Sequence, residues 1–499
     1  MYPKPLPDLK SNTFEFESIP LVKPTGFREY DARWLFPQEI NLMGIQALGM
    51  GLGTLAHEMG IRPDIVTGHD FRSYSSSIKY ALITGLMASG MHVHDVGLAL
   101  SPMSYFAQFA LDCPAVAMVT ASHNDNGWTG VKMGMNRPLT FGPDEINRLK
   151  DIILNSAFRF AEGGAYTFHP EIREQYIADL TNRPKLKRKL RVLAACGNGT
   201  AGAFAEQVFK AIGCDVVPLD TNPDFTFPHY NPNPEDMQML HAIAKAVVDN
   251  QCDVGLGFDG DGDRCGVVDN EGNEIFADKM GVMLARDFAA LHPNATFVVD
   301  VKSTGLFATD PVLKELGVTA DYWKTGHSYM KRRVNELGAL AGFEKSGHYF
   351  FNAPLGKGYD DGMVTGLSIC EMLDRNPDKT MADLYRALPK TWGSPTMAPY
   401  CADEIKYDVV ERVIRHFTDM FTKKEAIGGH AITDLVTVNG IRVVTDDGTW
   451  GLVRASSNKP ELVVVVESPV SEQRMREMFE AVDAVLRLNP EVGDYNQKL

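Results

Sequence analysis

Residues 254–264 read Val-Gly-Leu-Gly-Phe-Asp-Gly-Asp-Gly-Asp-Arg, an apolar run that leads into a loop of glycines and aspartates. Similar apolar runs, most of them ending in a cluster of Gly, Asp, Ser or Asn, occur at residues 65–67, 115–120, 191–195 and 297–301. Amphipathic stretches separate these runs, which is the pattern of α/β layers with largely parallel sheets. Because ligands bind at the carboxyl ends of such strands, the polar clusters are the candidate sites.

The length of 499 residues corresponds to about three or four domains, each large enough to bury its own core. Breaks rich in Gly, Pro and Asn divide the chain into four blocks, which we place at residues 1–168, 169–276, 277–392 and 393–499. The last block differs, because a charged helix-like stretch precedes short strands such as residues 462–466. The sequence therefore predicts an α/β fold of three mixed α/β-sheet domains followed by a smaller C-terminal α+β domain.

The composition is that of a globular protein, with 44% hydrophobic, 23% charged and 9% aromatic residues. The formal net charge of −15 makes nucleic acid and anionic membranes poor partners. The longest apolar runs are far below the roughly 20 residues needed to span a bilayer, and no export or transit peptide is visible. Seven scattered cysteines without a Cys-x-x-Cys spacing indicate reduced, mostly buried thiols. We expect a cytoplasmic protein.

The acidic loop is the first candidate site. Asp259, Asp261 and Asp263 stand at alternate positions, and the glycines between them allow a tight turn that brings three hard oxygen ligands onto one divalent cation. A calcium EF-hand does not fit, because that loop requires Gly where Arg264 stands and Glu where Asn270 stands. Three oxygens leave an octahedral Mg²⁺ with open positions for a phosphoryl oxygen and water. The alternative interpretation is an acidic turn on the surface, but such a turn does not require the glycines.

The second candidate is Thr120-Ala-Ser-His-Asn124, which follows an apolar strand and precedes Gly127, Gly130 and Lys132. We expect a serine at a strand end among glycines to be exposed for attack, with Lys132 stabilising the charge of a transferring group. His123 is adjacent in sequence, which seldom gives the facing geometry of a nucleophile and its base. Alone, this segment is more often a plain polar loop.

Three further clusters carry polar side chains: Gly342-Phe-Glu-Lys-Ser-Gly-His348, Lys324-Thr-Gly-His327 and Arg454-Ala-Ser-Ser-Asn-Lys-Pro460. The first can hydrogen-bond hydroxyl groups, and the last is suited to a phosphate dianion. Taken singly, each is more often a solvated loop than a site. A fifth set near the start contains Arg28, Tyr30, Asp31 and Arg33.

A rival function comes from Gly197-Asn-Gly-Thr-Ala-Gly202, which matches a dinucleotide-binding fingerprint. A strand precedes it, a helix-like stretch follows over residues 203–212, and Asp220 lies about 20 residues on. It predicts an NAD-dependent oxidoreductase. We favour a simple βα turn, because the oxidoreductase leaves the acidic loop and the Ser122 loop without a role. The similar Gly51-Leu-Gly-Thr-Leu-Ala56 lies in an apolar helical pattern with no strand before it.

Taken together and in order, these motifs resemble the α-D-phosphohexomutase family, above all its bacterial phosphomannomutase/phosphoglucomutase branch, from about Phe27 to Glu467. The acidic loop matches the family's metal loop without departure, Arg264 included. The Ser122 loop matches its phosphoserine loop, except that Asp125 replaces a proline and Thr129 an asparagine.

The other matches are partial. Glu344, Ser346 and His348 match the family's sugar-recognition motif, with Phe343 where glycine is usual. Arg454, Ser456 and Pro460 match its phosphate loop, in which Ser457 and Asn458 have changed identity. Tyr30 and Arg33 match its Tyr-Asp-x-Arg, with Trp34 replacing a glycine. Lys302 and His327 fall where the family has active-site residues.

The resemblance implies four domains around a central cleft and the exchange of hexose 1-phosphate and 6-phosphate, with mannose, glucose or both as the sugar. A phosphoserine at Ser122 and a hexose 1,6-bisphosphate, which also acts as activator, are the implied intermediates. The implied site residues have four roles: catalysis by Ser122, Lys132, His348, Arg264 and Arg33; Mg²⁺ binding by Ser122, Asp259, Asp261 and Asp263; phosphate binding by Arg454, Ser456, Ser457 and Asn458; and sugar contacts by Tyr30, Lys302, His327, Glu344 and Ser346. His348 is the leading general acid/base and Lys132 the second.

The implied partners are small-molecule sugar phosphates, with no nucleic acid and no membrane, for a monomer or small homo-oligomer. Three alternatives stay open: a phosphoglucosamine mutase, the NAD-dependent oxidoreductase, and a noncatalytic sugar-phosphate-binding protein. The glucosamine branch usually shows Ser-Gly-Thr in the last loop, where this chain has Ser456-Ser-Asn458.

Overall fold

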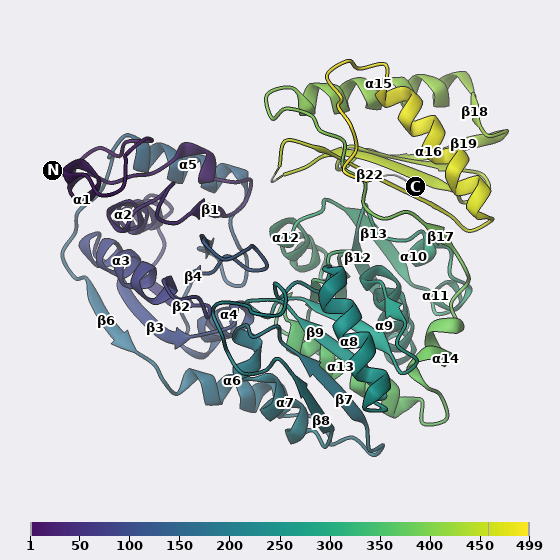
Figure 1. The fold of residues 1–499 in the computed structure, drawn as a ribbon, viewed down its shortest axis with the longest axis horizontal. Helices are drawn as coiled ribbons and strands as arrows, with labels where there is room; N and C mark the ends of the chain where they lie inside the picture. Colours follow the sequence, from purple (N-terminus) through teal and green to yellow (C-terminus); the bar gives the residue numbers. More distant parts are fainter. Residues whose placement is uncertain (1, 458, 498–499) are drawn as a thin grey trace. The chain divides into compact units, whose positions relative to one another are not determined.

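The computed structural model describes residues 2–457 and 459–497 (Figure 1). The described residues form two compact units, the first from residues 1–277 and 346–383 and the second from residues 278–345 and 384–499. The chain therefore passes from one unit to the other three times.

The first unit begins with a six-stranded mixed sheet of order β1-β5-β4-β2-β3-β6. Its parallel strands are β2 (Asp64–His69), β3 (His92–Leu98), β4 (Ala115–Val119) and β6 (Ala165–Phe168), and its antiparallel strands are β1 (Ala32–Leu35) and β5 (Trp128–Gly134). The helices are α1 (Phe14–Ser18), α2 (Leu42–Glu58), α3 (Ser75–Ala88), α4 (Ser101–Ala110) and α5 (Pro143–Leu154), with a 3₁₀ turn at Pro24–Gly26. Helices join the parallel strands because such strands need a crossover connection.

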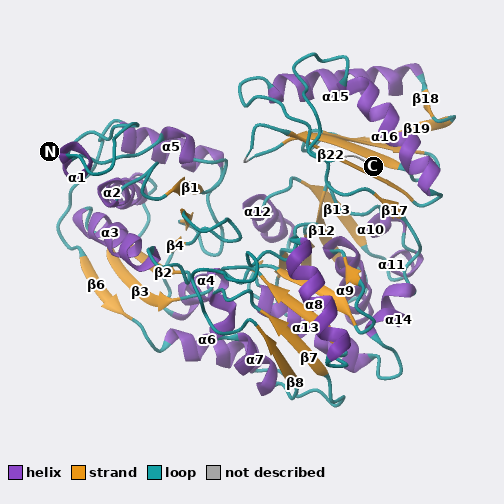
Figure 2. Ribbon diagram, in the orientation of Figure 1, coloured by secondary structure: helices purple, strands orange, loops and turns teal. Residues whose placement is uncertain are grey.

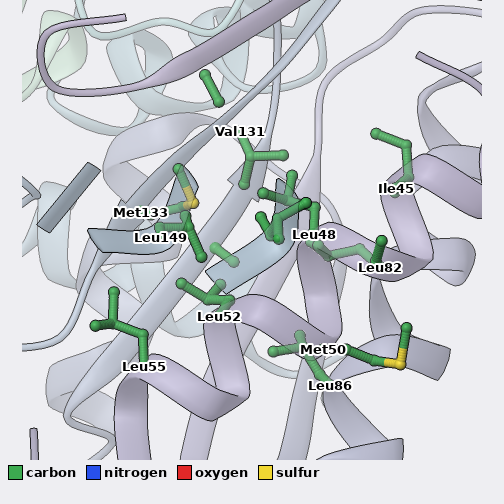
Figure 3. Packing of buried hydrophobic residues seen from close by; sticks show 14 of the residues in the cluster. Ile45, Leu48, Met50, Leu52, Leu55, Leu82, Leu86, Val131, Met133 and Leu149 are labelled. Atoms are coloured by element: carbon green, nitrogen blue, oxygen red, sulfur yellow. The ribbon is translucent and has the colours of Figure 1, made fainter. Parts of the chain in front are cut away.

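One buried cluster fills the space between this sheet and α2, α3 and α5 (Figure 3). Leu48 and Leu52 of α2 lie there with Leu82 of α3 and Leu149 of α5. α2 and α3 approach closely, since a Cβ added to Gly49 would lie 2.2 Å from the Leu82 carbonyl oxygen. Residues 51–56 therefore belong to a packed helix, as the sequence indicated. α4 covers the other face, where Ser104 Oγ lies 3.1 Å from Met118 Sδ.

The second sheet of this unit has the order β11-β10-β9-β7-β8. Parallel strands β7 (Arg191–Ala195), β8 (Asp215–Leu219) and β9 (Val254–Phe258) continue into antiparallel β10 (Cys265–Asp269) and β11 (Glu274–Ile275). The helices are α6 (Ile172–Thr181), α7 (Ala205–Ala211) and α8 (Met237–Asp249), with a 3₁₀ turn at Thr200–Ala203. The second segment of this unit, residues 346–383, contains helix α13 (Gly362–Arg375) and the hairpin of β15 (Tyr349–Phe351) and β16 (Tyr359–Asp360), whose strands are not part of this sheet.

The second unit contains parallel strands in the order β13-β12-β14 and an antiparallel C-terminal sheet in the order β17-β22-β21-β20-β19-β18. The first group comprises β12 (Thr296–Asp300), β13 (Thr319–Trp323), β14 (Ala341–Phe343), α9 (Ala277–Leu291), α10 (Leu306–Thr309), α11 (Pro311–Glu315) and α12 (His327–Leu337). Helix α14 (Met381–Arg386) contains the last passage of the chain between the units.

The C-terminal sheet comprises β17 (Trp392–Gly393), β18 (Ala426–Ile427), β19 (His430–Val436), β20 (Ile441–Thr445), β21 (Trp450–Ala455) and β22 (Leu462–Ser468). Helices α15 (Lys406–Lys423) and α16 (Glu472–Leu486) lie on one side of it (Figure 2). Val413 and Met478 pack there in one core, while Trp450 and Val465 face a second core on the other side.

The predicted fold class is confirmed: three mixed α/β sheets precede an α+β domain with an antiparallel sheet. The proposed boundaries at residues 168, 276 and 392 stay predictions. All seven cysteines are buried free thiols. Among the described residues, no helix has both the length and the apolar character that crossing a membrane requires.

Candidate active site

The loop that carries Ser122 follows β4 and is anchored by a pair of buried residues after the neighbouring strand β2. Asp70 Oδ2 accepts hydrogen bonds from Thr120 Oγ1 at 2.9 Å and from the Ala121 amide at 3.1 Å. Arg72 donates to the carbonyl oxygen of Ser122 at 3.0 Å and pairs with Asp70 at 3.2 Å. Sequence analysis missed both residues, although they follow β2 just as Ser122 follows β4 at the same edge of the sheet.

Ser122 is buried, with 1% of its surface exposed, so the expectation of an exposed serine is wrong. Two backbone contacts explain this: Arg72 holds its carbonyl oxygen, and Gly260 of the acidic loop packs against the same oxygen. The Ser122 hydroxyl donates to Asp259 Oδ2 at 3.0 Å. The two loops, far apart in sequence, thus meet at this hydroxyl.

His123 also differs from expectation, because its Nδ1 lies 3.3 Å from Ser122 Oγ. Ser122 has a φ of 51°, and this left-handed conformation turns the two neighbouring side chains toward each other. Burial, together with the positive charges of Arg264 and Arg33, holds the pKa of His123 well below its ordinary value. His123 is therefore a neutral neighbour of the serine hydroxyl.

The acidic loop follows β9, and its three aspartates are completely buried. One carboxylate oxygen from each lies within 4.8 Å of the others. Lys132 Nζ from β5 donates to Asp261 Oδ2 at 2.7 Å and to Asp263 Oδ2. Ser101 Oγ donates to the same Asp261 oxygen at 2.6 Å. The structure therefore brings Ser122, Lys132 and the aspartates into one buried polar cluster.

The charges of this cluster fit a bound metal ion. Burial and the neighbouring charges of Asp261 and Asp263 raise the pKa of Asp259 well above its ordinary value. Asp261 Oδ1 is buried and accepts no hydrogen bond from the described residues, which is costly for a carboxylate oxygen unless a cation satisfies it. Three aspartates and a serine hydroxyl are hard oxygen donors of the kind that Mg²⁺ prefers. The cluster can hold a divalent cation.

Lys132 is the cation that already faces these carboxylates. Burial opposes its charge, but attraction to Asp261 and Asp263 outweighs burial and holds the pKa of the amine well above its ordinary value. Lys132 is thus a permanent positive charge in this arrangement, which suits it to neutralising anionic oxygens.

The segment Ser346–His348 lies against the acidic loop, since the Cys265 amide donates to the Gly347 carbonyl oxygen at 3.0 Å. His348 Nε2 lies 3.4 Å from Asp263 Oδ1 and 3.4 Å from Arg264 Nε. Its Nδ1 lies 3.0 Å from Ser346 Oγ. Asp360 Oδ2 is 4.0 Å from the same Nε2 and was missed, although the acidic pair Asp360-Asp361 in the sequence is a signal.

Arg264, Arg33 and Tyr30 complete the predicted residues of the first unit. Arg264 pairs with Glu235 at 3.2 Å, and its backbone amide donates to Asp259 Oδ1 at 3.2 Å. Arg33 of β1 donates from Nε to Asp31 at 2.9 Å and from Nη1 to Asn124 of the Ser122 loop. Tyr30, which precedes Asp31 and Arg33 in the sequence, is also buried.

In the second unit, the structure groups Glu344 and Lys302 around Asp300. Glu344 is buried and accepts a hydrogen bond from the Gly326 amide at 2.5 Å. Lys302 Nζ is 4.0 Å from Asp300 Oδ2, which also accepts from Thr325 Oγ1 at 3.1 Å. His327 is buried as the first residue of α12. The predicted sugar motif is split, because Glu344 belongs to this unit while Ser346 and His348 belong to the first.

The predicted phosphate loop follows β21. Arg454 donates to the Ala455 carbonyl oxygen at 2.9 Å, and Ser456 is buried next to it. Ser457 is partly exposed, and Asn458 lies outside the described residues. Lys406 of α15, which sequence analysis missed, donates to the Ser456 carbonyl oxygen at 2.6 Å.

The rival dinucleotide loop is filled by the protein itself. A Cβ added to Gly202 would lie 2.0 Å from the Thr221 carbonyl oxygen, and one on Gly197 would lie 2.8 Å from Pro232. Asp220, the expected ribose ligand, accepts hydrogen bonds from the Tyr230 hydroxyl and His229, both at 2.7 Å. The glycines serve the packing of the βα turn, which removes the support for an NAD site.

Family models of known proteins match four consecutive parts of the chain. They are described as phosphoglucomutase/phosphomannomutase alpha/beta/alpha domain I over residues 24–160, domain II over 174–272, domain III over 276–392, and the C-terminal domain over 404–485. The chain belongs to the phosphoglucomutase/phosphomannomutase family.

Individual relatives agree with this assignment. Phosphomannomutase/phosphoglucomutase from Pseudomonas putida is 32% identical over 477 residues, which is 95% of this chain and 98% of the relative. Phosphoglucomutase from Neisseria meningitidis serogroup B is 33% identical over 460 residues, covering 91% and 96%. The crystal structure of a phosphoglucomutase/phosphomannomutase family protein from Burkholderia thailandensis has a TM-score of 0.84 at 29% identity, covering 95% of this chain and 99% of that chain.

The predicted family and enzyme class are confirmed by these comparisons. The relatives are mutases, which are intramolecular phosphotransferases. The fold of this chain is that of the α-D-phosphohexomutase superfamily.

Proposed function

We propose that this phosphoglucomutase/phosphomannomutase family member interconverts hexose 1-phosphate and hexose 6-phosphate of mannose, glucose or both. The observation that carries the proposal is the Ser122 hydroxyl, 3.0 Å from Asp259 in a buried cluster that also contains Lys132. O1 and O6 lie on opposite sides of a hexose, so one positioned base cannot move a phosphoryl group between them. A phosphoserine at Ser122 and a hexose 1,6-bisphosphate solve this geometric problem.

The metal of this proposal is Mg²⁺, held by Asp259, Asp261, Asp263 and an oxygen on Ser122. When bound, it supplies positive charge that stabilises the transferring phosphoryl group. Lys132 and Arg264 border the same cluster and contribute fixed positive charge from the protein.

Transfer begins with phosphoserine and a sugar monophosphate. The free sugar hydroxyl attacks phosphorus, the bond from phosphorus to the Ser122 oxygen breaks, and the hydroxyl proton goes to His348. The resulting 1,6-bisphosphate turns over, and the serine oxygen attacks its other phosphoryl group. The sugar oxygen released in this second transfer takes the proton back from His348. Ser122 ends phosphorylated, and the phosphate of the sugar has changed position.

The remaining predicted residues bind substrate in this proposal. Arg454, Ser456, Ser457 and Asn458 anchor the phosphate that does not react, because guanidinium and hydroxyl donors suit a phosphate dianion. Glu344 and Ser346 bind sugar hydroxyls in either orientation of the sugar. Tyr30, Lys302 and His327 line the bound substrate, whereas Arg33 belongs with Lys132 and Arg264 among the catalytic residues. A hexose 1,6-bisphosphate activates the enzyme by phosphorylating Ser122.

The test combines a substrate panel with one variant. Turnover of mannose 1-phosphate, glucose 1-phosphate and glucosamine 1-phosphate is measured with and without Mg²⁺ and a hexose 1,6-bisphosphate. Activity on glucosamine 1-phosphate alone would make the chain a phosphoglucosamine mutase. A change in nicotinamide absorbance without coupling enzymes would favour the oxidoreductase, and binding without turnover the noncatalytic alternative.

Ser122→Ala is expected to lose at least about 10³-fold in kcat while sugar phosphate still binds, because the covalent intermediate cannot form. Ser77→Ala, at an exposed position of α3, is the matched control and is expected to leave kcat unchanged. Intact-mass measurement after treatment with the bisphosphate is expected to show one added phosphoryl group in the control and none in Ser122→Ala. Near-normal turnover by Ser122→Ala contradicts the phosphoserine mechanism.

A further inference from the structure

Three histidines and two carboxylates that the proposed function does not use lie together at the start of β2, on the first half of β3 and directly after the end of β6. Asp64 and His92 are direct partners in the parallel pairing of β2 and β3. His92 and His94 stand two residues apart on β3, so their side chains project from the same face of the sheet. The imidazole rings of His92 and His94 have centroids 4.1 Å apart.

The distances within this group match the edges of a metal coordination sphere. Asp64 Oδ1 is 3.1 Å from His94 Nε2 and 3.5 Å from His92 Nδ1, and all three ligand atoms lie within 4.8 Å of one another. Tetrahedral Zn²⁺ binds imidazole nitrogen and carboxylate oxygen at about 2.0–2.2 Å, so its neighbouring ligand atoms are about 3.3–3.6 Å apart. The His94–Asp64 distance is slightly shorter than this range, and the His92–Asp64 distance lies within it.

A count of protons shows that the group lacks a positive centre. Three contacts run in a chain: Glu171 to His169 at 2.8 Å, His169 to His94 at 3.0 Å, and His94 to Asp64 at 3.1 Å. Each contact needs one shared hydrogen, because the carboxylates only accept, whereas two neutral imidazoles carry only two N–H hydrogens. In any arrangement of tautomers one contact is left with two lone pairs facing each other.

The positive charge that this group lacks would have to serve three atoms at once. This requirement favours a metal ion over an extra proton. His92 Nδ1 also faces Asp64 Oδ1, while its other nitrogen lies 2.8 Å from Thr167 Oγ1. A proton bridges two atoms along one line, whereas a metal ion binds three or four convergent donors. The ring nitrogens of both histidines and the carboxylate oxygen lie within 4.8 Å of one another, which is close enough for one ion to bind all three.

The outer contacts of the group are those that usually orient metal ligands. Metal-binding histidines commonly donate their second N–H to another polar group, and here His94 meets His169 and His92 meets Thr167. Arg62 holds the second oxygen of Asp64 at 2.8 Å, which leaves Oδ1 as a single ligand atom. The His92 side chain is 36% exposed, so water can reach a fourth position.

We propose that Asp64, His92 and His94 bind a Zn²⁺ ion, with water as the fourth ligand. This site is separate from the acidic loop: Asp70, which anchors the Ser122 loop, is six residues further along the chain, or about 20 Å at the rise of a strand. The chemistry also differs, because two imidazoles and one carboxylate select Zn²⁺ while an oxygen-only cluster suits Mg²⁺. The bound ion ties β2 to β3 at the edge of the sheet opposite the catalytic loops.

The test measures zinc binding by the full-length protein. Protein freed of metal by a chelator is kept in excess Mg²⁺ and titrated with Zn²⁺ in competition with a chromophoric chelator. Wild type is compared with His94→Gln, Asp64→Asn and His92→Ala, and the difference in bound zinc removes any contribution from the acidic loop. His430→Ala is the matched control, since His430 lies with Asp446 and Asp447 in another group that could hold a metal.

We expect each ligand variant to lose one equivalent of zinc, and His169→Gln, which alters an outer contact, to bind zinc about 10–100-fold more weakly. Co²⁺ in place of Zn²⁺ is expected to give the intense visible bands of four-coordinate cobalt in wild type and His430→Ala but not in His94→Gln. Thermal unfolding of the metal-free proteins checks that the variants are folded. If His94→Gln fails to fold, His92→Ala, at a partly exposed position, serves as the second ligand variant. Wild-type zinc binding by the folded ligand variants overturns the proposal.

Discussion

The contact between Gly260 and the Ser122 loop predicts a large catalytic effect from adding one methyl group. An alanine Cβ at position 260 would lie 2.5 Å from the Ser122 carbonyl oxygen, where side-chain carbons rarely come closer than 3.0 Å. Gly260 has no positive φ, so alanine meets no backbone strain there. The effect of Gly260→Ala therefore comes from this contact alone.

The magnitude follows from how far the serine must move. Relief of the overlap requires a shift of at least 0.5 Å, the difference between 3.0 Å and 2.5 Å. The carbonyl oxygen is fixed by Arg72 at 3.0 Å, so the displacement is shared between the Ser122 loop and the acidic loop. A misplacement of about 1 Å costs about 10²-fold in rate, so we expect Gly260→Ala to lower kcat about 10–100-fold, or about 1.4–2.7 kcal/mol.

The assay is steady-state turnover of glucose 1-phosphate with a saturating bisphosphate activator, together with thermal unfolding. Gly393→Ala is the control, because an added Cβ there would have no neighbour closer than 3.8 Å. The unfolding temperature of Gly260→Ala should fall only modestly, since the strain is local. A wild-type kcat in Gly260→Ala, or an equal loss in the control, refutes the view that the two loops must meet at this contact.

Three more predictions concern other parts of the chain. Arg454→Ala should raise KM about 10–100-fold with a smaller change in kcat, because a charged hydrogen bond to phosphate contributes about 1.5–3 kcal/mol; unchanged KM with lost kcat contradicts the anchoring role. Lys79→Met should lower the free energy of unfolding by about 3–5 kcal/mol in urea denaturation, since it strands the buried Asp95 carboxylate 2.7 Å from the Lys79 amine; an unchanged midpoint would show that this pair does not stabilise the fold. Burial raises the pKa of Asp361 to about 7, so the folded protein retains a proton that the unfolded chain, with a pKa of about 3.9, releases. The contribution of Asp361 to stability is therefore complete below about pH 4 and is lost as the pH rises to about 7. In chemical denaturation, wild type should lose about 4 kcal/mol of unfolding free energy over this window relative to Asp361→Asn. Parallel pH profiles of the two proteins would contradict the raised pKa.

Much of the fold could be predicted because its local signals agree with one another. The runs at residues 65–67, 115–120, 191–195, 254–257 and 297–301 all lie in or overlap strands. The charged stretch after residue 400 contains the amphipathic helix α15, whose buried positions include Val409, Val413 and Phe417. These elements are fixed by patterns that repeat over a few residues, which a sequence displays directly.

The site was less accessible to sequence analysis, because its geometry depends on backbone conformation and on distant partners. The left-handed φ of Ser122 brings the His123 side chain close to the serine hydroxyl. The presence of serine at position 122 does not by itself indicate this backbone conformation. Asp70 and Arg72 act through hydrogen bonds to residues about 50 positions away. The burial of Ser122 follows from the acidic loop, 138 residues later at Gly260, which a local pattern cannot contain.

The three passages of the chain between its units have a consequence for how the protein is made. The first unit lacks strands β15 and β16 and helix α13 until its second segment, residues 346–383, has been synthesised, although its two sheets are complete by residue 275. α13 packs tightly on Phe209 and Leu256, because an added Cβ at Gly366 would lie 2.6 Å and 3.0 Å from them. At about 5–20 residues per second, translation from residue 278 to residue 383 takes about 5–20 s. During that interval the nascent chain on the ribosome exposes an apolar surface whose cover has yet to be translated.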